Sequence, residues 1–500
     1  MQSKKFGLGV SKILTIGVTT TVIFGAAFTT SCSTKKEDET DEQYFSHFKP
    51  VLRFTVVSDA HISAYTTHLK HLQKFEDVYK DSYEYAQSQE YKGFDHVFVV
   101  GDGADDCYDL EGKSIQKFAD AVKEQSAKYN VETHAILGNH ELTSGLEFEL
   151  DYNKIVNIWK QKMHYDAIDF HIKLGDYHFI MFSPRDQFWM YDEDNLAPWL
   201  EGEIQKALAD DPTKTKPIFV FQHIGIKDTV YKTPASYMKR LKNPADPDSE
   251  VIPAYVINNV FKKYPQVVDF SGHSHAPITD PRAIYQKEYT AIATGSLCYF
   301  NMDLAGNPEY QTSVFSTPNS GGEWWSGIDP LLDGDDGNQF SIYELDKNGA
   351  MKMMIRDAYS HQQIGDPYCF RSFGNPSKFK YTEERKNTDP APKFDYTSET
   401  PKELTKSSVR FDLKQAKYAQ NYRCEIFKKS SNQSKTNELE TIYRLSDNWL
   451  SSQPATFKVN FGDKENPLDP NTNYEIKVTP INSWGKEGVP LILSFKTPEA

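Results

Sequence analysis

One short stretch, from His96 to Asp105, constrains the fold more than any other part of the chain. The four apolar residues after His96 predict a buried strand, because a strand covered on both faces needs no polar alternation. Gly101 and Gly103 flank Asp102 in a turn that another group can approach closely. Asp102 would then lie at the carboxyl end of a parallel strand, where open α/β sheets place their sites. Taken alone, the stretch fits a solvated, aspartate-rich turn equally well.

Four further apolar segments end in similar chemistry, and the early alternation of strands with helices predicts a parallel sheet built from right-handed crossovers. The predicted strands are 51–57, 132–137, 217–221 and 267–271. The polar residues that follow them are Asp59 and His61, Asn139 and His140, His223, and His273 and His275. A lone Asp-x-His or a lone histidine is more often structural. The complete ordered set instead predicts a metal site at one edge of a sheet.

The number of these residues favours two metal ions over one. A single zinc or iron needs about four to six donors, and a catalytic site leaves one position open. Without His140 the set still holds seven candidate ligands, so one carboxylate must be shared to complete two coordination spheres. The candidate ligands are Asp59, His61, Asp102, Asn139, His223, His273 and His275.

The order of motifs, D-x-H, G-D-x-x-D, G-N-H-E, H and G-H-x-H, resembles the calcineurin-like metallophosphoesterase family over about residues 51–356. This resemblance implies an α/β fold of the αββα sandwich type, with two mixed sheets flanked by helices. It also implies a role for each motif residue. Asp59, His61 and His275 would hold one metal ion, and Asn139, His223 and His273 would hold the other. Asp102 would bridge the two ions. His140 would contact the phosphate and assist the leaving group, and Asp105 would orient His140.

The function implied is two-metal-dependent hydrolysis of a phosphoester by a hydroxide that bridges the metals, which are Fe, Mn or Zn. The alternative is a binding or adhesive surface protein that keeps an inactive phosphoesterase fold. A small nucleotide, lipid or sugar phosphate is the expected substrate, with monoester and diester both open and no substrate-binding residue assigned. The irregular segments 224–251 and 301–339 are the candidates for setting specificity. A net charge of −14 argues against nucleic-acid binding.

The amino terminus predicts export from the cytoplasm. Basic residues at Lys4, Lys5 and Lys12 precede an uncharged, largely apolar run over 13–28. Residues 29–32, Thr-Thr-Ser-Cys, resemble the lipobox of a bacterial lipoprotein, which implies a signal peptide over 1–32, lipidation of Cys32 and a tether over 33–48 to a membrane. An uncleaved signal anchor is the alternative. Either alternative places the rest of the chain outside the cytoplasm.

The carboxyl-terminal part predicts a separate, small all-β domain. We expect the catalytic domain to cover 49–357, a linker or extended wrap 358–398, and the β domain 399–500. Apolar residues alternate with polar ones around Val409, Tyr422 and Tyr474. The stretch from Leu468 through Tyr474 to Phe495 resembles a fibronectin type III repeat, in which the residue matching Tyr474 forms a corner near a late strand. The other nine histidines of the chain were given no site and are interpreted as ordinary surface or core residues.

Overall fold

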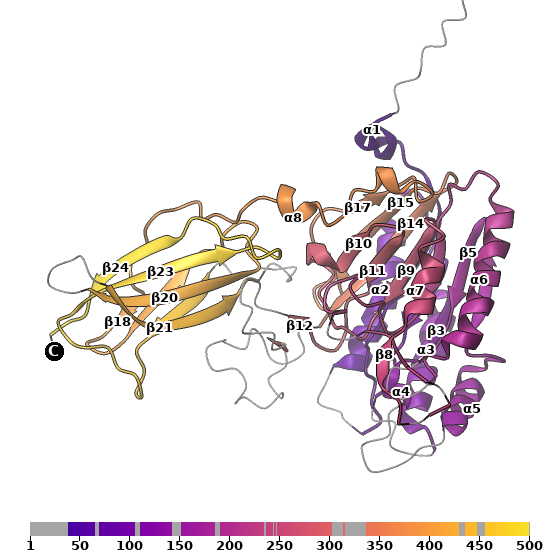
Figure 1. The fold of residues 1–500 in the computed structure, drawn as a ribbon, viewed down its shortest axis with the longest axis horizontal. Helices are drawn as coiled ribbons and strands as arrows, with labels where there is room; N and C mark the ends of the chain where they lie inside the picture. The colour runs from indigo at the N-terminus through magenta and orange to yellow at the C-terminus, as the bar shows by residue number, and fades with distance from the viewer. Residues whose placement is uncertain are drawn as a thin grey trace, which may run out of the picture. The chain divides into compact units, whose positions relative to one another are not determined.

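The computed structural model describes most of the chain after residue 38. The described residues are 39–65, 70–105, 111–142, 152–185, 191–234, 237–243, 245–246, 248–302, 314–315, 337–429, 436–447 and 456–499. A short helix, α1 (Asp41–Ser46), belongs to a compact unit that ends at His47. A second compact unit begins at Phe48 and contains all the sheets (Figure 1).

The first large sheet contains the strands of the first three predicted motifs. Strands β1, β2 and β3 run parallel, whereas β14 and β15 extend the sheet antiparallel on the other side of β1. The order across the sheet is β16 (Gln362–Gln363), β15 (Met351–Asp357), β14 (Gln339–Asp346), β1 (Pro50–Val57), β2 (His96–Val100) and β3 (Glu132–Ile136), with β17 (Tyr368–Phe370) also paired to β15.

The second large sheet contains the strands that precede the remaining histidine motifs. Strands β5, β6, β9 and β11 run parallel, and an antiparallel strand closes each side. The order is β10 (Ile284–Gln286), β11 (Thr290–Ala293), β9 (Val267–Ser271), β6 (Ile218–Phe221), β5 (Tyr177–Met181) and β4 (Phe170–Leu174).

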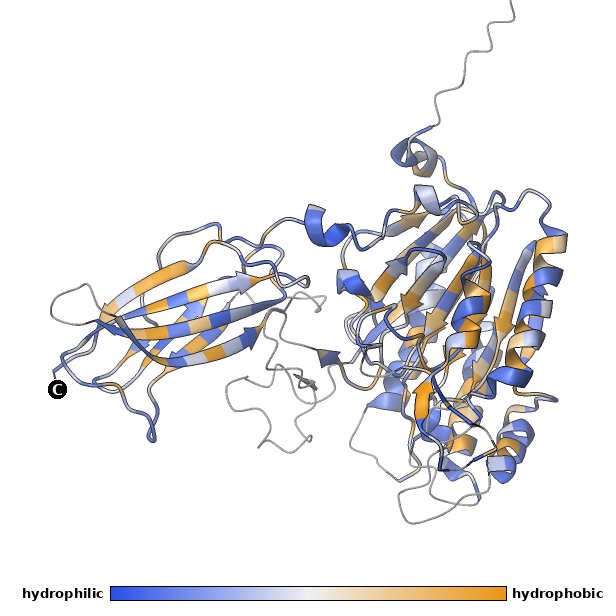
Figure 2. Cartoon of the chain, viewed as in Figure 1, coloured by the Kyte–Doolittle hydropathy of each residue, from blue (hydrophilic) through white to orange (hydrophobic). Residues whose placement is uncertain are grey.

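Three apolar layers hold these sheets and their helices together, so the predicted fold class of two mixed sheets flanked by helices is confirmed. Aromatic side chains from both sheets fill the middle layer, where Phe98 stacks on Phe179 and Phe221 with ring centroids 4.9 and 4.6 Å apart. Helices α2 (His71–Ser88), α3 (Lys113–Tyr129) and α5 (Tyr152–Met163) cover the outer face of the first sheet. Helices α6 (Glu193–Asp210) and α7 (Tyr255–Phe261) cover the second. Figure 2 shows orange, hydrophobic residues alternating with blue, hydrophilic ones on the helices.

Several elements differ from the sequence expectation in extent. Helix α6 begins at Glu193 and has Pro198 inside it, where a sequence pattern favours a helix start instead. The first irregular segment contains a short hairpin, β7 (Lys239–Leu241) with β8 (Val251–Pro253), and the second contains β12 (Asn301–Met302) paired with β13 (Val314–Phe315). Strands β16 and β17 lie within the predicted linker and join the first sheet. The remaining helices are α4 (Asn139–Leu142), η1 (Pro281–Ala283), η2 (Pro376–Lys378) and α8 (Arg385–Thr388).

The carboxyl-terminal strands form two antiparallel sheets around a core of their own, as the alternating pattern predicts. One sheet has the order β18 (Glu403–Leu404), β19 (Val409–Leu413) and β22 (Phe457–Phe461). The other has the order β21 (Thr436–Leu445), β20 (Asn421–Lys429), β23 (Asn473–Ile481) and β24 (Leu491–Lys496). Tyr474 forms the expected corner, because its hydroxyl accepts a 2.8 Å hydrogen bond from the Asp469 N–H.

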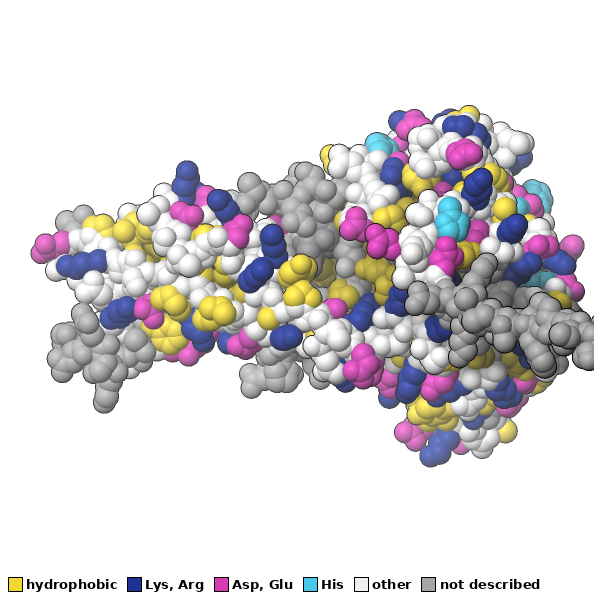
Figure 3. Space-filling model, turned by 90° about the horizontal axis from the view of Figure 1, so that it is seen from above, with side chains coloured by type: hydrophobic (Ala, Val, Ile, Leu, Met, Phe, Trp, Pro, Cys, Tyr) yellow, Lys and Arg dark blue, Asp and Glu magenta, His cyan; other side chains and the backbone are white. Residues whose placement is uncertain are grey.

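The predicted signal peptide and Cys32 lie outside the described residues. Within the described part of the chain, no helix combines the length and hydropathy needed to cross a bilayer. On the face drawn in Figure 3, basic and acidic side chains are interspersed.

Candidate metal centre

The predicted site residues converge at the carboxyl ends of strands from both large sheets. Strands β1 and β2 are parallel neighbours, and their pairing continues into the turns that follow them. The Asp59 N–H donates to Gly101 O at 3.2 Å, and the His61 N–H donates to Asp102 O at 2.9 Å. The second sheet contributes His223 after β6, and His273 and His275 after β9. Every candidate ligand and both predicted catalytic residues therefore meet at one edge of the sandwich.

The backbone at this edge is held in a conformation that residues with a Cβ rarely adopt. Five of the candidate ligands have left-handed φ angles: Asp59 (52°), His61 (49°), Asp102 (50°), His273 (59°) and His275 (50°). Such residues cost about 1–3 kcal/mol each and persist only where the surrounding structure imposes them. The left-handed turn redirects each side chain from the sheet toward the common centre. The rest of the fold must therefore offset the cost of these conformations.

Three motif glycines are required because ligand side chains lie against them. A Cβ on Gly138 would be 2.1 Å from Asp102 Oδ1, and one on Gly101 would be 2.4 Å from His223 Nδ1. A Cβ on Gly272 would be 2.7 Å from Asp59 Oδ2. These distances are far below van der Waals contact, so each glycine makes room for the carboxylate or imidazole of another motif.

Three of the histidines are held through Nδ1, which leaves Nε2 directed to the centre. His223 Nδ1 donates to Val100 O at 2.8 Å, and His275 Nδ1 lies 3.1 Å from Tyr299 O. His61 Nδ1 lies 3.5 Å from Asp105 Oδ2. A carbonyl or carboxylate behind an imidazole fixes its tautomer and orientation, as in protein metal sites generally. The Nε2 atom of His223 lies 3.0 Å from Asp102, and that of His61 lies 3.7 Å from the same carboxylate. The Nε2 atom of His275 lies 3.1 Å from Asp59.

The two aspartates are fully buried among these histidines. Burial raises the pKa of Asp59, but His275 beside it outweighs that effect and leaves the pKa below its ordinary value. Burial likewise opposes ionisation of Asp102, and His223 and His140 hold its pKa well below the usual range. Both carboxylates are therefore anionic at neutral pH, which suits them to binding cations.

His140 and Asp105 form a pair beside the candidate ligands. His140 Nδ1 donates to Asp105 Oδ1 at 2.7 Å, and the His140 backbone N–H donates to Asp102 Oδ1 at 2.8 Å. Burial lowers the pKa of His140, but Asp102 and Asp105 together raise it to about 10. Asp105 Oδ2 also approaches His61, so this carboxylate contacts both a candidate ligand and the predicted acid. The imidazole remains about one-third exposed, which keeps it accessible to a bound molecule.

Sequence reasoning left one important residue without a role, although it stands in the quoted G-N-H-E motif. The buried carboxylate of Glu141 accepts hydrogen bonds from the backbone N–H groups of Asp102 (3.1 Å), Ala104 (2.8 Å) and Gly138 (2.6 Å). Burial and the nearby Asp102 raise the pKa of Glu141 to about 7. This side chain ties the turn after β2 to the turn after β3, and so fixes Asp102 relative to Asn139.

Sequence reasoning also missed one support beside His275 and another beside Asp59. The Tyr299 ring stacks on His275 with centroids 4.0 Å apart and planes 19° from parallel. Ser58 Oγ hydrogen-bonds Asp59 Oδ2 and lies 2.7 Å from Thr294 Oγ1. Away from these groups, Arg185 is engaged by both carboxylate oxygens of Asp169.

The donors present fit two cations that share one carboxylate. Ligand atoms of Asp59, His61, Asp102 and His275 lie within 4.8 Å of one another, and those of Asp102, His223 and His273 form a second such group. Asn139 Oδ1 lies 3.1 Å from His223 Nε2, beside the second group. The buried His61 Nε2 has no hydrogen-bond partner among the described residues, as expected of an atom that binds a metal.

The region that holds these ligand groups matches a known protein family. Residues 52–277 match the family described as calcineurin-like phosphoesterase. The chain contains a calcineurin-like phosphoesterase domain. The matched region extends from the start of β1 to just beyond His275, and so includes every residue of the two ligand groups.

The solved structures that are similar to parts of this chain include two phosphatases and fibronectin type III domains. A dimetal phosphatase from Danio rerio is 10% identical, covering 65% of this chain and 100% of that one, with a TM-score of 0.39. A purple acid phosphatase from yellow lupin is 13% identical, covering 64% and 53%, with a TM-score of 0.38. A fibronectin type III domain of human collagen XX is 23% identical, covering 22% and 93%, with a TM-score of 0.15. No curated protein matches the chain.

Proposed function

We propose that this protein hydrolyses a phosphate ester at a centre of two metal ions, with Asp102 shared between them. The observation that carries the proposal is the overlap of the two ligand groups at Asp102. Asp59, His61 and His275 would complete one coordination sphere, and Asn139, His223 and His273 the other. Two bound cations would neutralise the substrate's phosphate charge and lower the pKa of a bound water, so that a nucleophile forms at neutral pH.

The chain's own side chains then orient the ligands and handle the leaving group's proton. Asp105 holds Nδ1 of His140 through the 2.7 Å hydrogen bond, so a proton on Nε2 is directed away from this carboxylate. An imidazole placed in this way can donate that proton, or a hydrogen bond, to the departing oxygen of the ester. Glu141 keeps the two turns in register, which preserves the relative positions of His140 and Asp102.

The substitution Asp102→Asn tests the proposal because it removes the charge at the shared position with almost no change in shape. We expect hydrolysis of aryl phosphate monoesters and diesters to fall below detection, while circular dichroism and thermal unfolding show a folded protein. Assays should add Mn, Fe or Zn back to stripped protein, because the donor set suits all three. The matched control is Asp120→Asn, which changes an exposed aspartate on α3 and should keep full activity. Full activity in Asp102→Asn would overturn the proposal.

For its natural setting, we propose that the enzyme acts on a small phosphorylated molecule outside the cytoplasm, anchored to a membrane through lipidated Cys32. The support is the order of a basic segment, an apolar run and a cysteine at the amino terminus. Cys32→Ala should release the protein from the membrane fraction and abolish incorporation of labelled palmitate. Unchanged membrane association would instead indicate an uncleaved anchor. The alternative of an inactive binding protein predicts metal binding without turnover of any phosphoester in the panel.

A further inference from the structure

A second group of metal-ligating side chains lies at the opposite end of the same strands. His96 is the first residue of β2, and it is paired in register with Glu132, the first residue of β3. His134 follows two residues later on β3, on the same side of the sheet as Glu132. Strand β2 spans four steps of about 3.3 Å between His96 and Val100, so about 13 Å of strand separates this group from the turn that contains Asp102.

The distances within this group match those of ligands around one small cation. His134 Nε2 lies 3.3 Å from His96 Nδ1. Two imidazoles about 2.05 Å from a tetrahedral zinc ion have nitrogens about 3.3 Å apart. The Glu132 oxygens lie 4.0 Å from His96 Nδ1 and 3.9 Å from His134 Nε2, about half an ångström beyond the corresponding spacing. The Glu132 side chain is 68% exposed, so rotation about its own bonds can close that gap.

The surroundings keep both imidazoles in the form that binds metals. The His134 ring stacks on Phe98 with centroids 5.3 Å apart, and burial, followed by the neighbouring His96, lowers the His134 pKa to about 4. Burial also lowers the pKa of His96. Neutral imidazoles need no deprotonation before ligation. The proton now shared across the 3.3 Å contact has only to move to the other nitrogen of its ring, so no proton is released.

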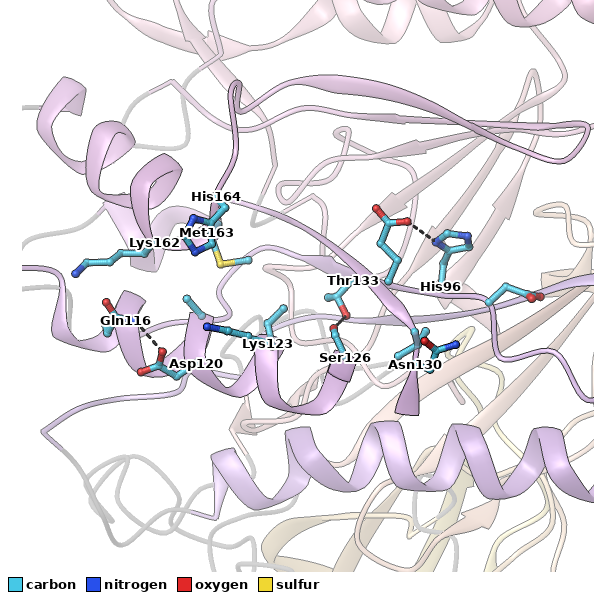
Figure 4. A pocket seen from close by; sticks show the side chains of 15 residues that line it. His96, Gln116, Asp120, Lys123, Ser126, Asn130, Thr133, Lys162, Met163 and His164 are labelled. Atoms are coloured by element: carbon cyan, nitrogen blue, oxygen red, sulfur yellow. Dashed lines mark hydrogen bonds and ion pairs between the residues drawn. The ribbon is translucent and has the colours of Figure 1, made fainter. Parts of the chain in front are cut away.

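A cavity of about 680 Å³ lies beside two of the three residues. His96 and Glu132 line it together with α3 residues and the end of α5. Figure 4 shows His96 toward one end of the cavity and Lys162 and His164 toward the other. Three protein ligands, one of them the exposed Glu132, leave a fourth position of a tetrahedral ion for water or a small anion, which is the pattern of an open zinc site.

Another histidine pair in the molecule shows what a purely structural arrangement looks like. His171 Nε2 lies 2.9 Å from His178 Nδ1, but His171 Nδ1 lies 2.7 Å from Glu203 and His178 Nε2 lies 3.3 Å from Asp210. The carboxylates there bind the outer nitrogens, so the four groups form a chain. Glu132 instead approaches the same two nitrogens that face each other, so three ligand atoms converge on one point.

We propose that His96, Glu132 and His134 bind one divalent transition-metal ion, with Zn²⁺ as the test ion, at a site separate from the phosphoesterase centre. This site is independent of the proposed hydrolytic function, because none of its residues belongs to either ligand group at Asp102.

The test is the zinc content of the full-length protein after equilibration with Zn²⁺ and removal of free metal. We expect the parent protein to retain one equivalent more than Glu132→Gln and His134→Gln, with phosphoester hydrolysis unchanged in both variants. Glu132 is exposed, so its variant keeps the fold even if His134→Gln is destabilised. His178→Asn, from the chain-like pair, is the matched control and should retain the parent's zinc content.

Anomalous diffraction at the zinc edge should place the extra ion about 2.1 Å from His96 Nδ1 and His134 Nε2. Equal zinc content in the parent and Glu132→Gln would overturn the proposal, as would an anomalous map without a peak between these nitrogens. Asp102→Asn should lose phosphoesterase activity but retain the zinc ion at His96, Glu132 and His134. That result would show that the two sites are separate.

Discussion

The phosphoesterase domain and the carboxyl-terminal β sandwich use their strands in opposite ways. In the sandwich, β24 alternates strictly between buried and exposed residues, so its side chains are committed to packing on one face and to solvent on the other. In the phosphoesterase domain, β1 and β2 are buried nearly throughout, and their polar chemistry is confined to the turns that follow. All 14 histidines of the chain precede residue 362. The sandwich therefore contributes packing, and the strand ends of the other domain carry the ligands.

The comparison also separates two kinds of buried acid. The histidines around Asp102 hold its pKa well below the usual range despite complete burial. In the sandwich, burial raises the pKa of Asp447 to about 6. The surroundings of the first acid stabilise its anion, whereas ionisation of the second destabilises the fold.

Among substitutions of residues other than the candidate metal ligands, we expect His140→Ala to have the largest effect, which is on kcat. Loss of a positioned proton donor costs about 10²- to 10⁴-fold in rate. We expect kcat to fall within that range while the metal content stays at the parent value, because the implied role of His140 is contact with phosphate rather than metal. With a substrate whose leaving group needs no protonation, such as a nitrophenyl ester, kcat should fall much less than with a substrate whose leaving group needs a proton. An equal fall in kcat with these two kinds of substrate would contradict the assigned role.

A pH-dependent effect of roughly 2–3 kcal/mol is expected at Asp447. Its pKa in the folded protein, about 6, lies above the unfolded value near 3.8. Ionisation therefore costs stability, and the free energy of unfolding of the sandwich should fall as pH rises from about 4 to 6 and then level off. Asp447→Asn should remove that slope. Hydrogen exchange of sandwich amides in the full chain measures it, and a slope that survives the substitution would exclude Asp447 as its source.

A smaller loss of about 10- to 100-fold in kcat is expected for Asp105→Asn. The amide retains an oxygen that can accept the His140 Nδ1 proton, but the charge that orients both His140 and His61 is gone. Because Asp105 also contacts His61, metal affinity should weaken slightly without loss of either ion at saturating metal. A variant that turns over like the parent would show that the carboxylate's charge is not required.

The smallest effect is expected from Tyr474→Phe in the sandwich. This change removes the 2.8 Å hydrogen bond from the Asp469 N–H and should lower local stability by about 1 kcal/mol. Hydrogen exchange should increase around the start of β23, and kcat and metal content should stay at parent values. A change in phosphoesterase kinetics would show that the sandwich is coupled to the catalytic centre.

The sequence predicted that the candidate ligands converge at one edge because its signals are local. Each ligand follows an apolar segment directly, and the carboxyl ends of parallel strands necessarily meet at one edge. The role of Glu141 was not predictable, because its three bonds depend on the conformations of two turns. The His96, Glu132 and His134 group was missed for a similar reason: only the pairing of β2 with β3 brings His96 and Glu132 together.

The most direct test of the account is the number of metal ions bound by Asp102→Asn and by Asp105→Asn, measured by elemental analysis after equal reconstitution. Asp102 is the carboxylate that belongs to both ligand groups, whereas Asp105 contacts His140 and His61. We therefore expect Asp102→Asn to lose metal from the phosphoesterase centre and Asp105→Asn to retain both ions at saturating metal. Equal metal loss in the two variants, or full occupancy in Asp102→Asn, would contradict the account.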